Sequence, residues 1–556
     1  MTASRRPTAD RSIGQYLIQR LQDYGIEDLF GIPGDYVLSF YGELENSPIN
    51  VVGCTREDCA GFAADAYARL NGMGAVCVTY CVGGFSVANS IAGAFAEKSP
   101  VVVISGSPGM SERKQGALLH HKVRDFRTQL EVFEKFTICA VELSDPLEAF
   151  AEIDRALDAA DRYKRPVYIE LPRDMVNVVP PMNHVYHGPA RSPNAEATAE
   201  AAAEVVQRLS RAERPLILAG VEIHRFGLQD TLLELAESMS IPIAATILGK
   251  SVISEQHPLF VGLYEGAMGH PEVTEFVEQS DLILMLGTFL TDINLGVFTA
   301  NLDPNRCVLA TSEALRISHH HYHDVPLDHF LEALKAAEPS ARGRAVPDSL
   351  RGVGTAPESP LQPDSPLRTT RMMARINRRL DPDTIVIADV GDCLFAATEL
   401  ITHDRGEFLS PAYYTSMGFG VPAGLGAAIA RKDHRIIVLV GDGAFQMTGQ
   451  ELSTLVRTSA SAIVIVLDNH GYGTERFLHP GEWKYNEIQP WAYHRLVDVY
   501  GGGKGYYCET EGEFEAALQT AWEDHAGPHL IQCKLEENDA SETLRVLAER
   551  MGQKVG

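Results

Sequence analysis

Basic residues are scarce in this sequence relative to acidic ones. The 556 residues include 48 Lys and Arg against 74 Asp and Glu, which gives a net charge of −26. Such a chain is a poor candidate for binding nucleic acid or an anionic membrane surface, because both require a basic surface. Hydrophobic residues make up 45% and charged residues 22%, which is ordinary globular composition and excludes disorder as the main state.

The sequence also lacks a pattern of paired cysteines and an export signal. Its nine cysteines are odd in number and scattered, and a chain of this length can build a core without disulfides. The opening segment MTASRRPTADRS carries basic residues with no apolar segment after them. We therefore expect a reducing, cytoplasmic location.

One long run, residues 70–96, has no charged residue and would be long enough to span a bilayer. Glycines interrupt it, and asparagine and serine side chains make it partly polar. We predict a buried strand over residues 75–81 and a buried helix over residues 86–96, and no membrane partner.

Short apolar runs that end in Gly or Asp alternate with helical periodicity along the whole chain. This alternation is typical of parallel sheets covered by helices on both faces. We predict an α/β protein of three consecutive doubly wound parallel-sheet domains, over residues 1–190, 191–340 and 368–556, the last with a C-terminal helix. Residues 341–367 are rich in Pro, Gly and Ser and lack periodicity, which indicates a linker.

Two predicted strands in the last domain end in polar residues. The apolar run RIIVLV leads into the GDG triplet at 441–443, and a second apolar run ends at residues 468–469. Open α/β sheets bind ligands at the carboxyl ends of their strands. Thr448 and Glu451 have the spacing of a capping box, which would begin the next helix.

These strand ends offer an all-oxygen set of donors. The Asp442 carboxylate, the Asn469 amide oxygen and the Gly471 carbonyl suit Mg²⁺, which leaves other octahedral positions to phosphates and water. Glycines beside them let a diphosphate approach the backbone closely. The alternative is two ordinary strand-end turns. A lone GDG is weak evidence, whereas a GDG followed by a second strand with an Asn turn is specific.

The arrangement resembles the signature of the thiamine diphosphate enzymes, in which GDG is followed by a spacer and an asparagine pair. Asp468 takes the place of the first asparagine here. The resemblance implies thiamine diphosphate and Mg²⁺ as cofactors, with Asp442, Asn469 and Gly471 as metal ligands. It also implies that the three domains are a pyrimidine-binding, a central and a diphosphate-binding domain.

Glu57 follows a predicted strand and opens a predicted helix in VVGCTREDCAGFAADAYARLNG, residues 51–72. Taken alone, a Glu in the first turn of a helix usually complements the helix dipole. The segment resembles the family's E-x₃–₅-A-A-D-[GA]-Y-A-R segment, however. That resemblance makes Glu57 the carboxylate that faces the aminopyrimidine ring of the cofactor.

Four features follow one another along the chain: GIPGDY at 31–36, Glu57, the histidine pair of GALLHHKVRDF, and GYGTERF at 471–477. This order resembles that of 2-keto-acid decarboxylases of the pyruvate and indolepyruvate type, over nearly the whole chain but weakly in the second domain. Histidine pairs can move protons near neutral pH, although most are ordinary loop residues. The resemblance implies the acid/base residues Asp35, His120, His121 and Glu475. It implies the cofactor contacts Gly391, Asp392, Thr415, Met417, Gly443 and Ala444.

The resemblance implies non-oxidative decarboxylation of a 2-keto acid to an aldehyde and CO₂, through a thiamine diphosphate carbanion and enamine. In this family Glu57 and the diphosphate anchor come from different subunits. We therefore expect a homo-oligomer, at least a dimer and by analogy a dimer of dimers.

Four residues that match the substrate-pocket positions of the family differ from those of pyruvate-specialised relatives. They are Leu394, Phe395, Thr474 and Leu478. Smaller side chains at the pocket positions favour substrates with branched, long or aromatic side chains, because such pockets discriminate mainly by volume. The C-terminal helix, residues 540–551, is a further candidate for filling the site.

Two rival functions stay open at this point. A carboligase of the acetolactate synthase type would also use Met417 as a wedge under the cofactor, but the histidine pair and Glu475 speak against it. A non-catalytic nucleotide-binding scaffold would not need Glu57, the histidines and Glu475 together. A histidine tract at 319–323 could bind a metal, but a solvated loop or strand edge is the preferred interpretation.

Overall fold

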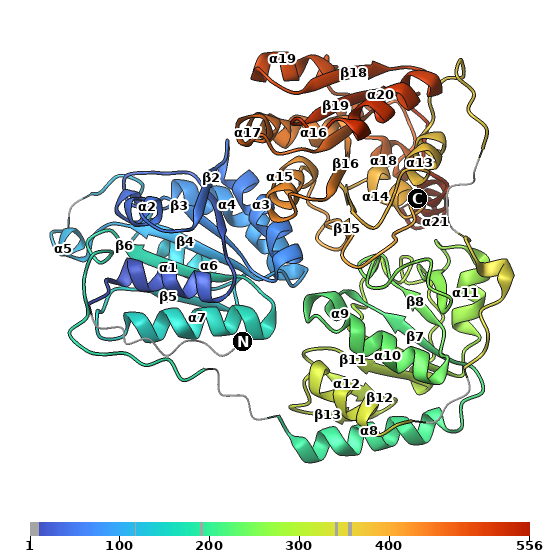
Figure 1. Ribbon diagram of the computed structural model, residues 1–556, viewed down its shortest axis with the longest axis horizontal. Helices are drawn as coiled ribbons and strands as arrows, with labels where there is room; N and C mark the ends of the chain where they lie inside the picture. Colours follow the sequence, from blue (N-terminus) through green and yellow to red (C-terminus); the bar gives the residue numbers. More distant parts are fainter. Residues whose placement is uncertain (1–9, 117, 189–192, 340–342, 354–358, 556) are drawn as a thin grey trace.

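The computed structural model describes residues 10–116, 118–188, 193–339, 343–353 and 359–555, which form three α/β domains (Figure 1). The N-terminal domain lies on one side, and the central and C-terminal domains lie together on the other. No helix in the described part of the chain is both long and apolar enough to cross a membrane. Residues 70–96 instead hold β3 (Gly74–Val78) and α4 (Val82–Ala96), so the predicted buried strand and helix are confirmed with shifted bounds.

The N-terminal sheet is entirely parallel, in the order β2-β1-β3-β4-β6-β5. Its other strands are β1 (Asp28–Gly31), β2 (Asn50–Gly53), β4 (Val101–Ser107), β5 (Cys139–Glu142) and β6 (Val167–Pro172). Its other helices are α1 (Ile13–Asp23), α2 (Leu38–Glu45), α3 (Glu57–Asn71), α5 (Met110–Arg113), α6 (Thr128–Phe133) and α7 (Ala149–Tyr163). Apolar clusters lie on both faces of this sheet, as a doubly wound fold requires.

The central sheet has the order β13-β12-β11-β10-β7-β8-β9, and β12 and β13 join it antiparallel. Its strands are β7 (Pro215–Ala219), β8 (Ile243–Ala245), β9 (Phe260–Leu263), β10 (Leu282–Leu286), β11 (Cys307–Ala310), β12 (Leu315–Ile317) and β13 (His320–Tyr322). Its helices are α8 (Ala195–Leu209), α9 (Val221–Arg225), α10 (Gln229–Met239), α11 (Pro271–Glu278), α12 (Leu327–Ala336) and the 3-10 turns η1 (Pro304–Arg306) and η2 (Asp348–Leu350). The histidine tract forms the edge strand β13, where His320 pairs with Glu204 at 2.8 Å.

The C-terminal sheet is parallel, in the order β15-β14-β16-β17-β19-β18. Its strands are β14 (Thr384–Ala388), β15 (Phe408–Leu409), β16 (Arg435–Gly441), β17 (Ile463–Asp468), β18 (Lys504–Cys508) and β19 (His529–Lys534). Its helices are α13 (Thr369–Asn377), α14 (Asp392–Ala397), α15 (Gly420–Ala430), α16 (Asp442–Thr448), α17 (Leu452–Thr458), α18 (Gly473–Leu478), α19 (Leu496–Tyr500), α20 (Glu511–Glu523) and α21 (Glu542–Val555), with the 3-10 turns η3 (Gly449–Glu451), η4 (Lys484–Asn486) and η5 (Tyr493–Arg495).

Buried ion pairs accompany the contacts between domains. Helix α3 packs on α15, and Arg69 of α3 pairs with Glu97 at 3.0 Å and donates to the Ser410 carbonyl at 2.9 Å. Lys98 pairs with Glu222 of the central domain at 2.8 Å. Because these charged groups are shielded from water, each is stabilised mainly by its oppositely charged partner. The packing of the domains sets the distance between the two partners.

Candidate functional site

The carboxyl ends of β16 and β17 place the GDG aspartate beside the asparagine turn. Strand β16 is an almost fully buried apolar run, and Asp442 begins α16 directly after it. The Asp442 carboxylate accepts the backbone N–H of Gly443 at 2.8 Å and that of Gly471 at 3.0 Å. One buried side chain therefore joins the two strand ends that the sequence predicts to lie together.

Asp442 is buried close to a second carboxylate. Burial, reinforced by the neighbouring Asp468 carboxylate, raises its pKa to about 7. Asp468 is also buried, and its Oδ1 atom lacks a hydrogen-bond partner in the described structure. Asp442 lines a cavity together with Asn469 and Gly471, whose amide and carbonyl oxygens complete a hard oxygen set that fits Mg²⁺.

Two glycines make this turn possible. Gly471 has a φ of +138°, and a Cβ there would lie 1.9 Å from the Asn486 carbonyl oxygen. A Cβ on Gly443 would lie 2.7 Å from the ring of Tyr472. A side chain at either position would collide with these neighbouring groups, so glycine allows the close packing of the turn. Both glycines also line a cavity, where their backbone can meet a ligand.

A cavity of about 110 Å³ opens at these strand ends. Ten of the residues predicted from the sequence line it: Gly391, Asp392, Met417, Asp442, Gly443, Ala444, Asn469, Gly471, Thr474 and Glu475. Glu475 lies in α18 and remains exposed to solvent. The cavity thus combines the oxygen donors with a free carboxylate.

Asp389, which sequence reasoning missed, fixes the loop that carries Met417. Its buried carboxylate accepts the N–H groups of Gly418 at 3.1 Å and Gly420 at 2.7 Å, as well as that of Val390. Burial raises its pKa to about 6. A polar residue directly after an apolar strand was the available signal, since such residues are usually hydrogen-bonded when buried.

Thr415 lies in the same loop but does not line the cavity. Its φ is +54°, which is rare for a β-branched residue and costs conformational energy. Its N–H donates to the Pro411 carbonyl at 2.8 Å. This bond and the positive φ show that the turn at Thr415 is held in an uncommon backbone conformation.

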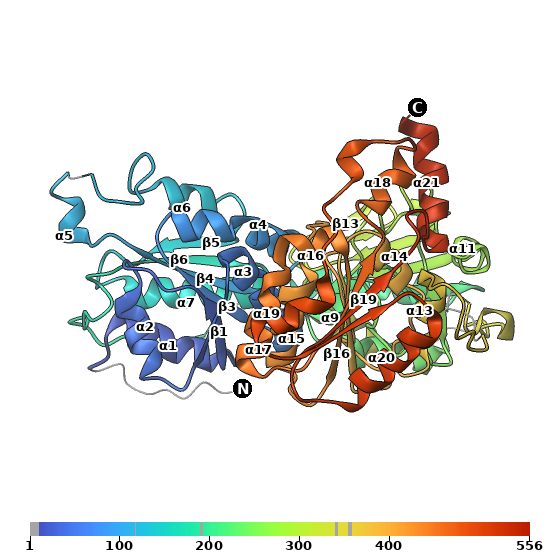
Figure 2. The same ribbon diagram turned by 90° about the horizontal axis from the view of Figure 1, so that it is seen from above.

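Asp392 has a structural partner as well as a place in the cavity wall. Its carboxylate accepts the Ser541 N–H and hydroxyl directly before α21. Burial raises the pKa of Asp392 to about 6. This contact ties the C-terminal helix to α14, and α21 packs beside α18 (Figure 2).

The predicted substrate-pocket residues separate into two groups. Phe395 and Leu478 pack with Leu544 and Leu547 of α21, and Thr474 lines the cavity. Leu394 faces the other way, into the apolar core of the C-terminal domain, and is 1% exposed. The structure therefore does not bring Leu394 to this wall, because neighbouring residues on α14 point in different directions.

Glu451 does not cap a helix with Thr448, so the predicted capping box is wrong. Helix α16 already begins at Asp442, and the Thr448 hydroxyl donates to the Gly418 carbonyl at 2.7 Å. The buried Glu451 carboxylate accepts the Thr55 hydroxyl at 2.6 Å and its N–H at 3.1 Å. It thereby links the C-terminal domain to the segment that leads into α3.

Glu57 and the histidine pair lie in the N-terminal domain, and no lining residue of the cavity comes from the described part of that domain. Glu57 begins α3 and is half-buried. Asp35 and His120 are in contact, with 2.7 Å between Oδ2 and Nε2, and His121 Nε2 lies 3.8 Å from Asp35 Oδ1. The side chains of His120 and Asp35 are 59% and 42% exposed.

Tyr36 and Arg173, which were not predicted, support this exposed cluster. The Tyr36 ring stacks on His120 with 4.7 Å between ring centroids. The Arg173 guanidinium lies over the Tyr36 ring, 5.1 Å from its centroid, with a nitrogen 3.8 Å from Asp35 Oδ2, and it also bonds Glu112. Tyr36 is visible in the sequence as part of GIPGDY, but nothing near Arg173 in the sequence indicates its position.

Three family models match the chain in succession. They describe the N-terminal TPP-binding domain of thiamine pyrophosphate enzymes over residues 11–126, their central domain over 202–334 and their C-terminal TPP-binding domain over 389–533. The donor set at Asp442, Asn469 and Gly471 falls within the last of these.

Whole-chain relatives agree with the family models. The chain is 37% identical over 545 residues to an indole-3-pyruvate decarboxylase of Azospirillum brasilense, covering 96% of this chain and 97% of the relative. It is 32% identical over 552 residues to a probable pyruvate decarboxylase of Schizosaccharomyces pombe, covering 96% and 95%. It is 33% identical over 530 residues to pyruvate decarboxylase 1 of Oryza sativa, covering 92% and 86%. The chain therefore belongs to the thiamine pyrophosphate enzymes, within the family of 2-keto-acid decarboxylases.

Proposed function

We propose that this chain converts a 2-keto acid with a branched, long or aromatic side chain into an aldehyde and CO₂, without oxidation. The cavity at the ends of β16 and β17 carries this proposal, because it places the oxygen donors, the open glycine backbone and Glu475 around one space. Thiamine diphosphate, when bound there, supplies the electron sink for decarboxylation. Asp442, Asn469 and the Gly471 carbonyl would hold Mg²⁺, and Gly391, Gly443 and Ala444 would contact the diphosphate.

The proton-handling residues complete the proposal. Glu57 would bond the aminopyrimidine ring, and the Thr415 carbonyl would bond the amino group of that ring. Glu475 would lie beside the substrate carboxylate. His120, oriented by Asp35 at 2.7 Å, would transfer a proton at the reacting carbon, with His121 next to it.

The two sets of groups lie on different parts of one chain, which supports a shared site. The Asp35–His120 cluster is exposed on the N-terminal domain, and the cavity belongs to the C-terminal domain. We propose that a partner chain supplies Glu57 and the cluster, in a dimer or a dimer of dimers. All nine cysteines are free and only Cys54 is not fully buried, which supports a cytoplasmic location.

We base the substrate class on Phe395 and Leu478, which do not line the cavity themselves but belong to α14 and α18, two helices that contribute residues to its lining. These residues pack with α21, and Thr474 is small enough to leave room beside Glu475. The test is aldehyde formation from pyruvate, 2-ketoisovalerate, 2-ketoisocaproate and phenylpyruvate with thiamine diphosphate and Mg²⁺. We expect a larger acid to have the highest kcat/KM. A higher value for pyruvate than for all the others would overturn the substrate class, and acetolactate as the main product would favour the carboligase.

The role of Glu57 has its own test. Glu57→Gln should fold and bind Mg²⁺ but lose nearly all turnover, because the amide cannot exchange the proton that the aminopyrimidine ring requires. Asp58→Asn, one residue further in the same helical turn, is the matched control and should stay active. Near-normal aldehyde formation by Glu57→Gln would contradict the assignment.

A further inference from the structure

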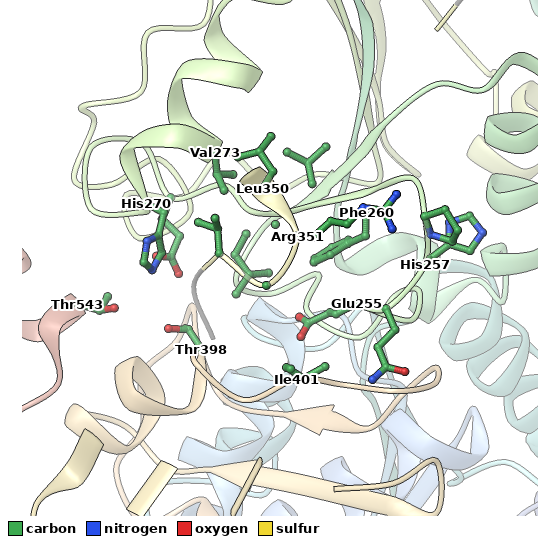
Figure 3. Close-up of a pocket in the computed structure, with 18 residues that line it drawn as sticks. Glu255, His257, Phe260, His270, Val273, Leu350, Arg351, Thr398, Ile401 and Thr543 are labelled. Carbon is green, nitrogen blue, oxygen red and sulfur yellow. The ribbon is translucent and has the colours of Figure 1, made fainter. Parts of the chain in front are cut away.

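A second cavity lies between the central domain, residues 350–353 and the C-terminal domain (Figure 3). Its volume is about 190 Å³, and it shares no lining residue with the cavity at β16 and β17. Phe260, Val273 and Leu350 lie on one side, and Thr398 and Ile401 lie on the other. Most of the cavity wall is apolar. The three parts of the chain that form it are far apart in sequence.

Glu265 lines this cavity, and its carboxylate is buried there. Its side chain is 4% exposed and forms no hydrogen bond or ion pair in the described structure, and its Oε1 atom is shielded from solvent. Burial raises its pKa to about 7. An unpaired acid in an apolar wall costs stability, so its position calls for a ligand that pairs with it.

The charged groups around Glu265 already have partners. The nearest cation, Lys250, bonds Glu255 at 2.6 Å and the Leu400 carbonyl at 2.6 Å. His257 bonds Glu237 at 3.2 Å, and Arg351 lies 3.1 Å from Asp348. His270 lines the cavity but is exposed. Lys250 therefore attracts Glu265 only through space, and none of these cations bonds the Glu265 carboxylate in the part of the chain that the structure describes.

We propose that this cavity binds a small organic ammonium ion, with the cationic group on Glu265 and the apolar body against Phe260, Val273 and Leu350. The size fits, since a cavity of about 150 Å³ accommodates one benzene ring. A carboxylate ligand is excluded by charge, because Glu265 and Glu255 both face the space. A neutral ligand would fill the volume but leave the charge unpaired.

The probe is benzylammonium chloride, titrated into the full-length protein loaded with thiamine diphosphate and Mg²⁺ and followed by calorimetry. Because Glu265 must be ionised, affinity should rise roughly tenfold from pH 6 to pH 8. Benzyl alcohol, which has the same shape without the charge, should bind weakly at both pH values.

Glu265→Gln should lose the tighter binding and its pH dependence, and Glu265→Leu should do the same. Glu275→Gln, on the exposed face of α11, is the matched control and should bind like the parent. The proposal is overturned if the parent shows no saturable binding, or if its affinity does not rise with pH. It is also overturned if Glu265→Gln keeps the same pH dependence, because His270 would then account for it.

Discussion

The buried carboxylate of Asp389 accepts three backbone N–H groups, those of Val390 beside it and of Gly418 and Gly420, which follow Met417 within three residues. Asp389→Ala would leave these donors without an acceptor, and each buried unsatisfied group costs about 1–3 kcal/mol. Three such donors would cost about 3–9 kcal/mol in total, so we expect the free energy of unfolding, measured by urea denaturation, to fall by at least about 3 kcal/mol. Asp433→Ala, in an exposed loop, should change it by less than about 0.5 kcal/mol. An equal, small change in both variants would show that the loop does not depend on Asp389.

Glu265 should also make stability depend on pH. Its pKa is about 7 in the folded chain and about 4.3 when unfolded, so the folded state holds its proton over that window. The parent should therefore lose stability relative to Glu265→Gln as the pH rises from 4 to 7. Urea denaturation at pH 5 and pH 8 measures this difference, with Glu275→Gln as the control for losing one charge. The prediction would be refuted if the free energy of unfolding of Glu265→Gln exceeded that of the parent by no more at pH 8 than at pH 5.

Sequence motifs identify the residues that contact a ligand more readily than the residues that hold those contact residues in position. The GDG and asparagine turns predict that Asp442 and Asn469 come together, and the structure brings them to one cavity. Asp389 and Arg173 act on groups distant in the chain. The position of Asp389 after an apolar strand marks it as a buried polar residue without naming its partners, and nothing local marks Arg173. Leu394 shows the converse, because adjacent positions on α14 face different surroundings.

At the scale of elements, the contact between α3 and α15 depends on a missing side chain. A Cβ on Gly426 of α15 would lie 2.1 Å from the Ala63 carbonyl oxygen of α3, and backbone cannot move aside easily. Gly426→Ala should therefore destabilise the protein by at least about 1–3 kcal/mol, as overpacking of a core does. Thermal and urea unfolding measure the effect.

The matched control is Gly42→Ala in α2. No atom lies within 4 Å of a Cβ at that position, so alanine should add about 0.4–1 kcal/mol by restricting the unfolded chain. If Gly426→Ala were as stable as Gly42→Ala, the two helices would not pack as closely as described.

The sequence predicted elements correctly where an apolar run is completely buried. It failed where contacts with other parts of the fold determine the local structure. Strands β16 and β17 are buried apolar runs, so their sequences predict them. The capping box was wrong because Thr448 and Glu451 bond other parts of the fold. The antiparallel edge strands β12 and β13 are three residues each, too short to carry a periodic signal.

For the whole molecule, the net charge of −26 proved a poor guide to ligands. It argues against polyanionic partners, yet the family's cofactor is itself a diphosphate. The cavity reconciles the two, because oxygen donors for a metal ion and open backbone beside Gly443 and Gly471 need no basic surface. A site shared between chains is a property of the assembly, and the sequence indicates it through resemblance to the family.

Complementation between two inactive variants tests the shared site. Glu57→Gln removes the proposed contribution of the N-terminal domain, and Asp442→Asn removes that of the C-terminal domain. If each site joins two chains, a mixed dimer has one site with both changes and one with neither. Co-expression at equal levels should then restore about a quarter of the parent's aldehyde formation, because half of the dimers are mixed and each has one intact site of two.

Each variant expressed alone is the control and should be nearly inactive. The second mixture combines the parent with a double variant that carries Glu57→Gln and Asp442→Asn in one chain. In a shared-site dimer, one dimer in four then consists of two parent chains and is fully active. The mixed dimers have no intact site. The two mixtures would therefore both retain about a quarter of the parent's activity for a shared site. For a site within one chain, the first mixture would be inactive and the second would retain about half. That contrast separates the two architectures without requiring any knowledge of the preferred substrate.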